Sequence, residues 1–170
     1  MVMYHGTPNK NVNIFDRGKI WTSTDSWMFG RWFYFTKDKK RAESYTKRKW
    51  NVWELKEVYL DVKNPFVINS EADVERFNEY YLKYTKNVLK DYFEGWQKWS
   101  LEKMYAEWYE KWTQALRDAW FDGVIDNMGW EMKQVIVFEP TQIKSATNNI
   151  WAFDKTNPDI YNKSWNSKRF

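Results

Sequence analysis

The only histidine of this 170-residue chain, His5, lies in the segment Tyr4-His5-Gly6-Thr7. An imidazole can donate to a hydroxyl group and accept from one, and the glycine beside it lets main-chain N–H and C=O groups approach a ligand closely. Two later segments carry further candidates, the aromatic run 33–36 and the apolar run 134–138, which begins with Gln134. The chemistry of such a site must come from oxygen, amide and aromatic groups.

Composition excludes several classes of site. The chain has no cysteine, so disulfides and thiolate metal sites are excluded, and a single histidine argues against a zinc centre. We therefore expect no metal. The net charge is +4, with lysines spread along the chain, which favours an anionic ligand or partner without establishing nucleic-acid binding.

The length and hydropathy of the chain indicate one domain over residues 1–170, and we expect a monomer. A polar stretch follows the first residues without the apolar core of a signal peptide, and no apolar run approaches the roughly 18 residues of a membrane span. The sequence thus predicts a protein without membrane contact in the cytoplasm.

Aromatic residues make up 21% of the chain, including 13 tryptophans. Many of the tryptophans sit beside charged residues, as in Lys49-Trp50, Lys98-Trp99 and Lys111-Trp112, which suits amphipathic rings at the edge of a core. Stacking on nucleic-acid bases is a second interpretation, and it predicts binding that weakens steeply with salt.

The first 70 residues are typical of strands joined by short loops. We expect a turn at 16–18, a buried strand over 31–36, and a helix from Lys39 to about Tyr45 capped by Asp38. A further strand over 52–62 should end at Asn64-Pro65.

Residues 70–122 predict two helices that form a hairpin beside the sheet. Asn69 or Ser70 is expected to cap the first, and Gly95 to mark the break. The apolar faces are assigned from three- and four-residue spacing: Val74, Phe77, Tyr81, Tyr84 and Val88 in the first helix, and Leu101, Met104, Trp108, Trp112, Ala115 and Leu116 in the second. These faces suit core packing, with a partner-binding surface as the alternative.

The last third predicts two short strands, over 123–125 and 134–138, separated by a turn at 127–129. Pro140 should end the second strand. Beyond Ala146 the chain is rich in Asn, Lys and Asp, and we expect mostly irregular surface there.

The order of three motifs resembles the ADP-ribosyltransferases, in the branch of the poly(ADP-ribose) polymerases and diphtheria toxin. These motifs are Tyr-His-Gly-Thr at 4–7, Gly-x-x-x-Tyr-Phe-Thr at 30–36, and the segment 134–145, which ends in Pro-Thr-Gln-Ile-Lys-Ser. Within this branch the chain is most similar to the small domains of phage polyvalent and head-associated proteins, which segments 58–65 and 153–160 also resemble. The resemblance covers 3–70 and 120–161, and leaves out the helical middle.

The resemblance implies an α+β fold with a split, mostly antiparallel β-sheet and an inserted helical hairpin over about 70–122. The absence of Gly-x-Gly-x-x-Gly agrees that a nucleotide would not be held in the Rossmann manner. The implied activity is displacement of nicotinamide from NAD and transfer of ADP-ribose to a macromolecular acceptor. A phage-encoded, toxin-like enzyme would find that acceptor among host proteins, with nucleic acid as the other class.

The resemblance also assigns site residues. His5 would hydrogen-bond the adenosine-side ribose, Gly6 would hold the nicotinamide carboxamide through its backbone, and Thr7 would support the loop. Tyr34 and Tyr45 would flank the nicotinamide ring. Without the other motifs, His5 would be interpreted as an ordinary strand histidine, and core packing competes as the role of Tyr34.

Two positions depart from the family pattern. Ala42 stands where many relatives carry a serine that binds the carboxamide, which predicts weaker NAD binding. Gln134 stands where the family has its catalytic glutamate, so His5, Tyr34 and Gln134 replace His-Tyr-Glu. Glutamine keeps a hydrogen bond to ribose but supplies no negative charge for an oxocarbenium-like transition state.

This loss leaves three outcomes open: slow mono-ADP-ribosylation, rescue by Glu131 or Glu139, or an inactive NAD-binding relic. Glu139 should face away, at an odd number of residues from Gln134 along a strand. A binding module for NAD or ADP-ribose that recruits a partner is therefore the main alternative to a transferase. Lys10 and Lys144 are candidate diphosphate contacts by charge alone, or solvated lysines.

Overall fold

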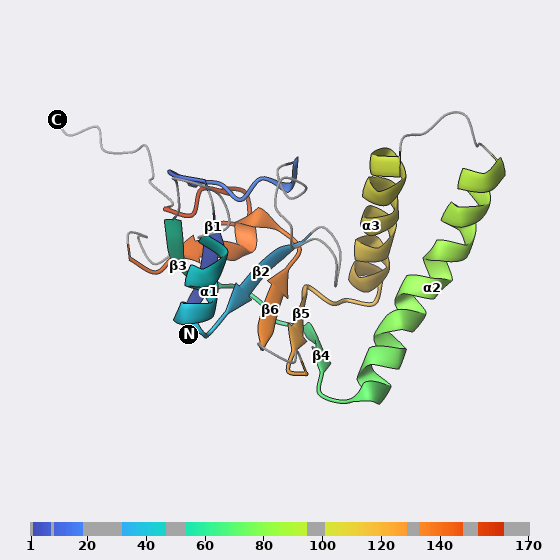
Figure 1. Ribbon diagram of the computed structural model, residues 1–170, viewed down its shortest axis with the longest axis horizontal. Coiled ribbons are helices and arrows are strands. Elements are labelled where there is room, and N and C mark those ends of the chain that lie inside the picture. Colours follow the sequence, from blue (N-terminus) through green and yellow to red (C-terminus); the bar gives the residue numbers. More distant parts are fainter. Residues whose placement is uncertain are drawn as a thin grey trace.

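The computed structural model describes residues 2–7, 9–18, 32–46, 54–94, 101–128, 133–147 and 153–161. Within these ranges an α+β fold combines one sheet with three α-helices (Figure 1). The helices are α1 (Lys39–Thr46), α2 (Glu71–Glu94) and α3 (Leu101–Asp118). The strands are β1 (Met3–Thr7), β2 (Phe33–Thr36), β3 (Glu54–Leu60), β4 (Pro65–Ile68), β5 (Gly123–Asp126), β6 (Gln134–Val137) and β7 (Ile143–Ser145).

The sheet has the strand order β4-β5-β6-β2-β1-β3-β7. Its described pairs are antiparallel except for β4 and β5, which run parallel. Adjacent parallel strands need a long crossover connection, and the pair α2–α3 provides it. The two helices are therefore part of a βααβ unit that positions β5. We had expected a helical hairpin inserted beside the sheet, without this role in connecting two of its strands.

Local signals explain the helix starts. The main-chain N–H of Arg41 donates to Asp38 Oδ1 at 3.1 Å, as the predicted cap of α1 requires. At α2 the N–H of Asp73 donates to Ser70 Oγ at 3.3 Å, and the Asp73 carboxylate accepts from the N–H of Asn69 and the hydroxyl of Ser70. These hydrogen bonds lower the pKa of Asp73.

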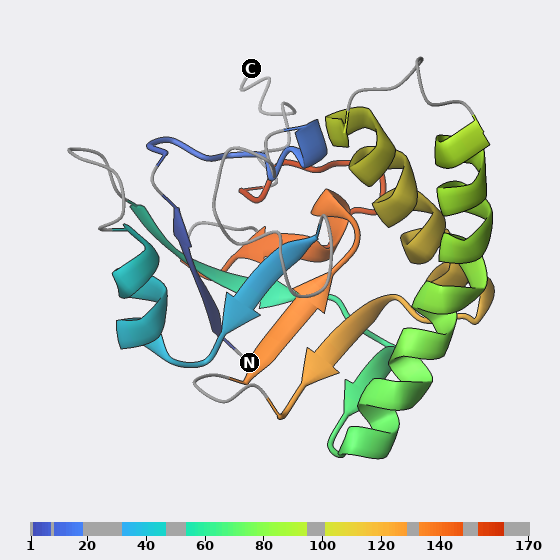
Figure 2. The same ribbon diagram turned by 45° about the vertical axis from the view of Figure 1, so that its right-hand side comes forward.

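All three helices cover the same face of the sheet. Lys39 of α1 donates to Glu57 of β3 at 3.1 Å and lies over the ring of Tyr4 in β1. Over the other half of the sheet, α2 and α3 contribute to a cluster of buried apolar residues: Trp32, Phe66, Ile68, Phe77, Trp112, Leu116, Val124, Ile136 and Phe138. Figure 2 shows α1 (cyan) on one side and α2 and α3 (green to yellow) on the other, with β2 and β6 between them.

The opposite face is covered by irregular chain. Phe15 and Ile160, from segments near the two ends, join strand residues in a second buried cluster: Met3, Phe15, Phe33, Phe35, Val58, Val137, Ile143 and Ile160. Ile160 is completely buried, and its carbonyl accepts from the N–H of Ser145 at 2.7 Å. The expectation of mostly irregular surface beyond Ala146 is therefore wrong for residues 157–161, which help to close this face.

Several predicted elements are confirmed and some details are wrong. The strands predicted over 31–36, 123–125 and 134–138 are confirmed as β2, β5 and β6, and the buried face formed by Trp112, Ala115 and Leu116 is as predicted. Val74 is 36% exposed, however, and the next turns of α2 bury Phe77 and pack Tyr80 against the core. Pro65 begins β4, a strand that the sequence did not predict. Gly95, the side chains of Tyr81, Tyr84, Val88, Leu101 and Met104, and Gly129 of the turn at 127–129 lie outside the described residues.

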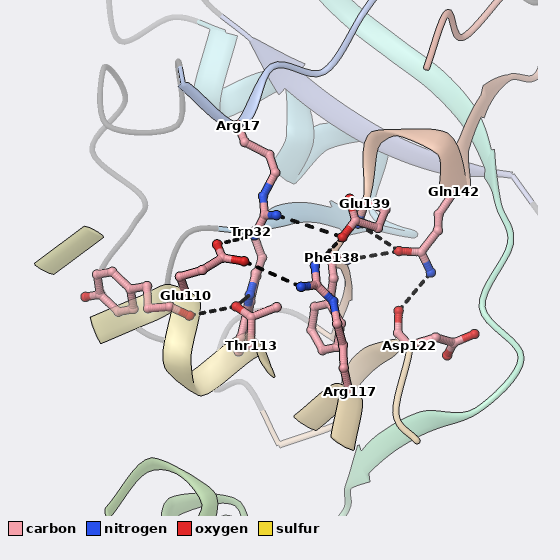
Figure 3. Close-up of polar contacts among 10 residues, drawn as sticks. Arg17, Trp32, Glu110, Thr113, Arg117, Asp122, Phe138, Glu139 and Gln142 are labelled. Carbon is pink, nitrogen blue, oxygen red and sulfur yellow. Dashed lines mark hydrogen bonds and ion pairs between the residues drawn. The ribbon is translucent and has the colours of Figure 1, made fainter. Parts of the chain in front are cut away.

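The Gln142 side chain joins three strand ends (Figure 3). Its Oε1 accepts from the N–H groups of Phe138 at 3.0 Å and Glu139 at 2.9 Å. Its Nε2 donates to the carbonyls of Asp61 at 3.0 Å and Asp122 at 2.8 Å. All four hydrogen-bonding positions of the carboxamide are thus used at the junction of β3, β5 and β6.

We expect Gln142→Ala to lower the free energy of unfolding by about 2–4 kcal/mol, since four main-chain groups lose their partner. Urea denaturation measures this change. Gln114→Ala is the matched control, because Gln114 makes one exposed hydrogen bond, to Asp118 at 2.7 Å. The control should lose less than about 0.5 kcal/mol, and equal losses in the two variants would contradict this role for Gln142.

Helix α3 ends on an unusual residue. The N–H groups of Trp120 and Phe121 donate to the carbonyls of Arg117 and Leu116, at 2.8 and 2.9 Å, which is the pattern of a Schellman motif. Trp120 occupies the left-handed position with φ 68°, and it is 85% exposed. Glycine usually takes this position because side chains with Cβ strain it.

Trp120→Gly should raise the free energy of unfolding by about 0.5–1 kcal/mol, because relief of left-handed strain outweighs the entropy of the added glycine. Trp120→Ala retains the Cβ and serves as the control. Thermal denaturation of both variants tests this expectation, which fails if the glycine variant is no more stable than the alanine variant.

Candidate functional site

Strands β1 and β2 are joined by a single described residue pair, Tyr4 with Thr36. On its other edge β1 pairs with β3 over five residues, and β2 pairs with β6 over four. The sheet is therefore split between β1 and β2, as the resemblance implied, and the candidate residues His5, Gly6 and Tyr34 follow on both sides of the split.

The His5 ring bridges the split. Its Nδ1 lies 2.9 Å from the carbonyl oxygen of Tyr34, which can only accept a hydrogen bond. Nδ1 therefore carries a proton, and in the neutral ring Nε2 is the acceptor nitrogen. The ring also packs against Phe15 and Phe35, with centroid distances of 5.0 and 5.4 Å. The orientation of the imidazole is thus fixed by two aromatic rings and one main-chain carbonyl.

The side chains of His5 and Tyr34 lie on opposite faces of the sheet. His5 contacts Phe15 and Phe35 of the second cluster, whereas the half-buried Tyr34 packs against the cluster beneath α2 and α3. Core packing is thus part of the role of Tyr34. Thr7 is buried, and its Oγ1 accepts from the N–H of Asn9 at 3.2 Å, consistent with support of the loop after β1.

Gln134 lies directly opposite Thr36 of β2, at the start of β6. Side chains that are opposite in an antiparallel pair share a face, so Gln134 is on the side of the sheet that carries the helices. Tyr34 shares this face because it pairs with Ile136 of the apolar cluster. The structure therefore brings Tyr34 and Gln134 to one face of neighbouring strands, half-buried in both cases.

Helix α1 places Ala42 against the sheet, where it is 2% exposed. The methyl group makes no polar contact, so α1 offers no hydroxyl at the position where relatives carry a serine. The side chain of Tyr45 lies outside the described residues.

The remaining charged candidates are separate from this face. Glu139 follows the far end of β6, and its carboxylate is hydrogen-bonded and ion-paired to Arg117, with Arg17 at 3.9 Å (Figure 3). Glu139 therefore pairs with α3 and lies at the other end of β6 from Gln134. Glu131 lies outside the described residues, and Lys10 is exposed.

Both interpretations of Lys144 are wrong. The side chain is completely buried, and its Nζ donates to the carbonyls of Asn157 at 2.6 Å and Asp159 at 2.9 Å. Burial lowers the pKa of this lysine, and the carboxylates of Asp154 and Asp159 act in the opposite direction. Lys144 anchors the segment 157–161 and is not available to a diphosphate.

Sequence reasoning missed one acidic residue of this region, Asp126. It ends β5 directly opposite Gln134 and is 3% exposed. Only the strand register relates the two positions, so the sequence carries no signal for it beyond an acidic residue at the end of a short apolar run.

A surface pocket of about 470 Å³ lies on the other face of the sheet. It is lined by Ile14, Phe15, Asp16, Arg17, Pro140 and Pro158. Phe15 contacts His5 from this side. None of Gly6, Tyr34 and Gln134 lines it, so we do not assign the pocket to the candidate site.

A sequence model of the family described as "ADP-Ribosyltransferase in polyvalent proteins" matches residues 1–153. The chain belongs to this family. The match includes α2 and α3, which the resemblance had left out. No curated protein and no solved structure gives a significant match.

Membership of the ADP-ribosyltransferases supports transferase chemistry in general, with NAD as the substrate and an acceptor for ADP-ribose. Among the described residues no group of His, Cys, Asp or Glu is arranged to hold a metal ion. In the same part of the chain no helix has the length and apolar character needed to cross a membrane.

Lys144→Met should lower the free energy of unfolding by about 1–3 kcal/mol, since two buried carbonyls lose their donor. The difference should widen as the pH rises toward 10.5, the ordinary pKa of lysine. In this range the unfolded wild type still binds a proton that the folded protein has lost, so wild-type stability increases with pH relative to the variant. Lys63→Met, on a side chain that is 69% exposed, is the control in urea denaturation at pH 7 and 10. A constant difference would contradict the lowered pKa.

Proposed function

We propose that the protein is an NAD-dependent mono-ADP-ribosyltransferase that modifies a macromolecular acceptor. The observation that carries this proposal is the split between β1 and β2, with the fixed His5 ring and the main chain of Gly6 on one side and Tyr34 and Gln134 on the other. The candidate residues lie on β1, β2 and β6, which are neighbours in the sheet, and this adjacency supports the proposal.

In the proposed reaction, the glycosidic bond between nicotinamide and the adjacent ribose carbon breaks. Its electron pair leaves with the nicotinamide nitrogen, which becomes neutral. A nucleophilic oxygen or nitrogen of the acceptor bonds to the same carbon and releases its proton to water. The enzyme needs no covalent nucleophile, and its part is to hold the ribose and the nicotinamide in place while positive charge grows on the sugar.

Within this scheme Nε2 of His5 accepts a hydrogen bond from a ribose hydroxyl, while Nδ1 remains engaged with Tyr34. Gly6 binds the nicotinamide carboxamide through its main chain, and Tyr34 and Tyr45 flank the ring. Gln134 hydrogen-bonds the ribose. Because it lacks the glutamate's charge, turnover should suffer more than NAD affinity.

Transfer of one ADP-ribose unit is favoured over polymer formation, since the glutamate used for elongation is replaced by Gln134. The net charge of +4 suits an acceptor with an acidic surface. A host protein in the bacterial cytoplasm is the acceptor that a phage-encoded enzyme would meet.

The test follows labelled NAD in a bacterial lysate and measures nicotinamide release and transfer of label to macromolecules. We expect wild-type protein to transfer label slowly, His5→Ala to transfer none, and Gln134→Glu to release nicotinamide about 10²–10³ times faster, the usual effect of one preorganised electrostatic contact. Release by Gln134→Glu alone would indicate an intact pocket with silenced chemistry. No release from either protein would support the binding module instead.

A pair of His5 variants separates binding from folding. His5→Asn places an amide N–H near the position of Nδ1, so it can keep the bond to Tyr34 while losing Nε2. Its melting temperature should stay close to that of the wild type while NAD affinity falls about tenfold, the value of one hydrogen bond. His5→Gln retains a polar group near Nε2 but loses the bond to Tyr34, so its melting temperature should fall further than that of His5→Asn. Equal NAD affinity of His5→Asn and wild type, measured by calorimetry, would contradict the ribose contact.

A further inference from the structure

One row of side chains crosses six strands of the sheet on the helix-covered face. The strand register places Ile68, Asp126, Gln134, Thr36, Tyr4 and Glu57 successively opposite one another. Neighbouring positions in such a row are about 4.8 Å apart along the sheet. Gln134 therefore has Thr36 on one side and Asp126 on the other.

The environment of Asp126 is largely apolar. The residue is 3% exposed, and its other neighbour in the row, Ile68, is 1% exposed. Two residues earlier in β5, Val124 is completely buried beneath α2 and α3. A carboxylate in such surroundings acts through a low effective dielectric, so its charge reaches neighbouring groups with little screening.

A turn after β5 accounts for one hydrogen bond of the Asp126 carboxylate. Asp126 Oδ1 accepts from the N–H of Met128 at 2.9 Å, which closes an Asx turn after β5. Asparagine or serine would close the same turn without placing a charge in a buried position. A carboxylate here places a buried acidic group directly opposite Gln134 on the neighbouring strand.

We infer that Asp126 supplies, from the neighbouring strand, the negative charge that Gln134 lacks. This inference rests on the proposed transferase function. In the proposed complex with NAD, Gln134 donates a side-chain N–H to the Asp126 carboxylate, a contact that the structure does not itself contain, and directs Oε1 toward the ribose. The polarised carboxamide and the charge behind it together oppose the positive charge that grows on the sugar. Asp126 is thus a positioning residue that acts through Gln134.

The experiment compares wild-type protein with Asp126→Asn, Gln134→Glu and the double variant that exchanges the two groups. Asp126→Asn keeps an acceptor for the Met128 N–H and removes the charge. We expect its kcat for nicotinamide release to fall about tenfold to hundredfold with KM within about twofold, because the charge matters in the transition state. Gln134→Glu should raise kcat by a larger factor in the Asp126→Asn background than in the wild type, because only there does it restore a charge that is missing.

A second readout does not depend on activity. Gln134→Glu puts two carboxylates opposite each other on adjacent strands, which is destabilising. Its melting temperature should fall below that of the wild type and recover in the double variant, and this coupling tests the register. If Asp126→Asn does not fold, Asp126→Ser keeps the turn and takes its place. Asp118→Asn, at the exposed end of α3, is the control for loss of a carboxylate and should leave kcat unchanged.

The outcomes separate this inference from the proposed function. His5-dependent release with equal kcat in wild type and Asp126→Asn would overturn the role of Asp126 and leave the transferase standing. The same holds if Gln134→Glu raises kcat by the same factor in both backgrounds. No release of nicotinamide from any variant would overturn both.

Discussion

The candidate site depends on the parting of β1 and β2 after a single residue pair. Strands that separate leave main-chain groups without ladder partners, and burying such groups is costly. The imidazole of His5 offsets this cost at the Tyr34 carbonyl, to which it donates in place of a neighbouring strand. One side chain therefore bridges the split, and the same hydrogen bond fixes its tautomer. In the proposed function, the same residue therefore serves both the fold and the ligand.

The packing on the two faces follows from this split. On one face α1 covers the β1–β3 side, and α2 and α3 cover the β4–β6 side, so the polar row from Asp126 to Glu57 crosses both halves of the sheet and ends against α1, where Lys39 donates to Glu57. On the other face, Phe15 and Ile160 close the core. The segment that carries Ile160 is anchored by Lys144, whose ammonium donates to the main-chain carbonyls of Asn157 and Asp159. The ends of the chain thus support the strands that carry the site.

The elements that the sequence predicted are those with strong local signals. Asp38 caps α1 as its spacing indicates, and Asp122-Gly123 and Pro140 delimit β5 and β6. The sequence did not predict β4 and β7, because strands of four and three residues are too short to show an alternation of apolar and polar residues. In β4 the first residue is also Pro65, and proline usually indicates the end of a strand. The buried state of Lys144 could not be predicted, since it depends on carbonyls of a segment that folds back from residue 157 onward.

The same distinction applies to the site. His5, Gly6, Tyr34 and Gln134 are candidates because they lie in motifs that are contiguous in sequence. Asp126 and Gln142 act through partners brought close by strand pairing, Asp126 opposite Gln134 and Gln142 bound to Asp61, Asp122 and Phe138. Long-range register decides these relationships, and a single sequence does not contain it.

The most direct test of the account is a crystal structure of the protein with a non-hydrolysable NAD analogue. We expect the nicotinamide ring to lie at the split, against the main chain of Gly6 and flanked by Tyr34, with Gln134 on a ribose hydroxyl and a second ribose hydroxyl on Nε2 of His5. A ring bound on the opposite face, in the pocket beside Phe15, would contradict the account, as would an analogue that leaves His5 and Gln134 without contact.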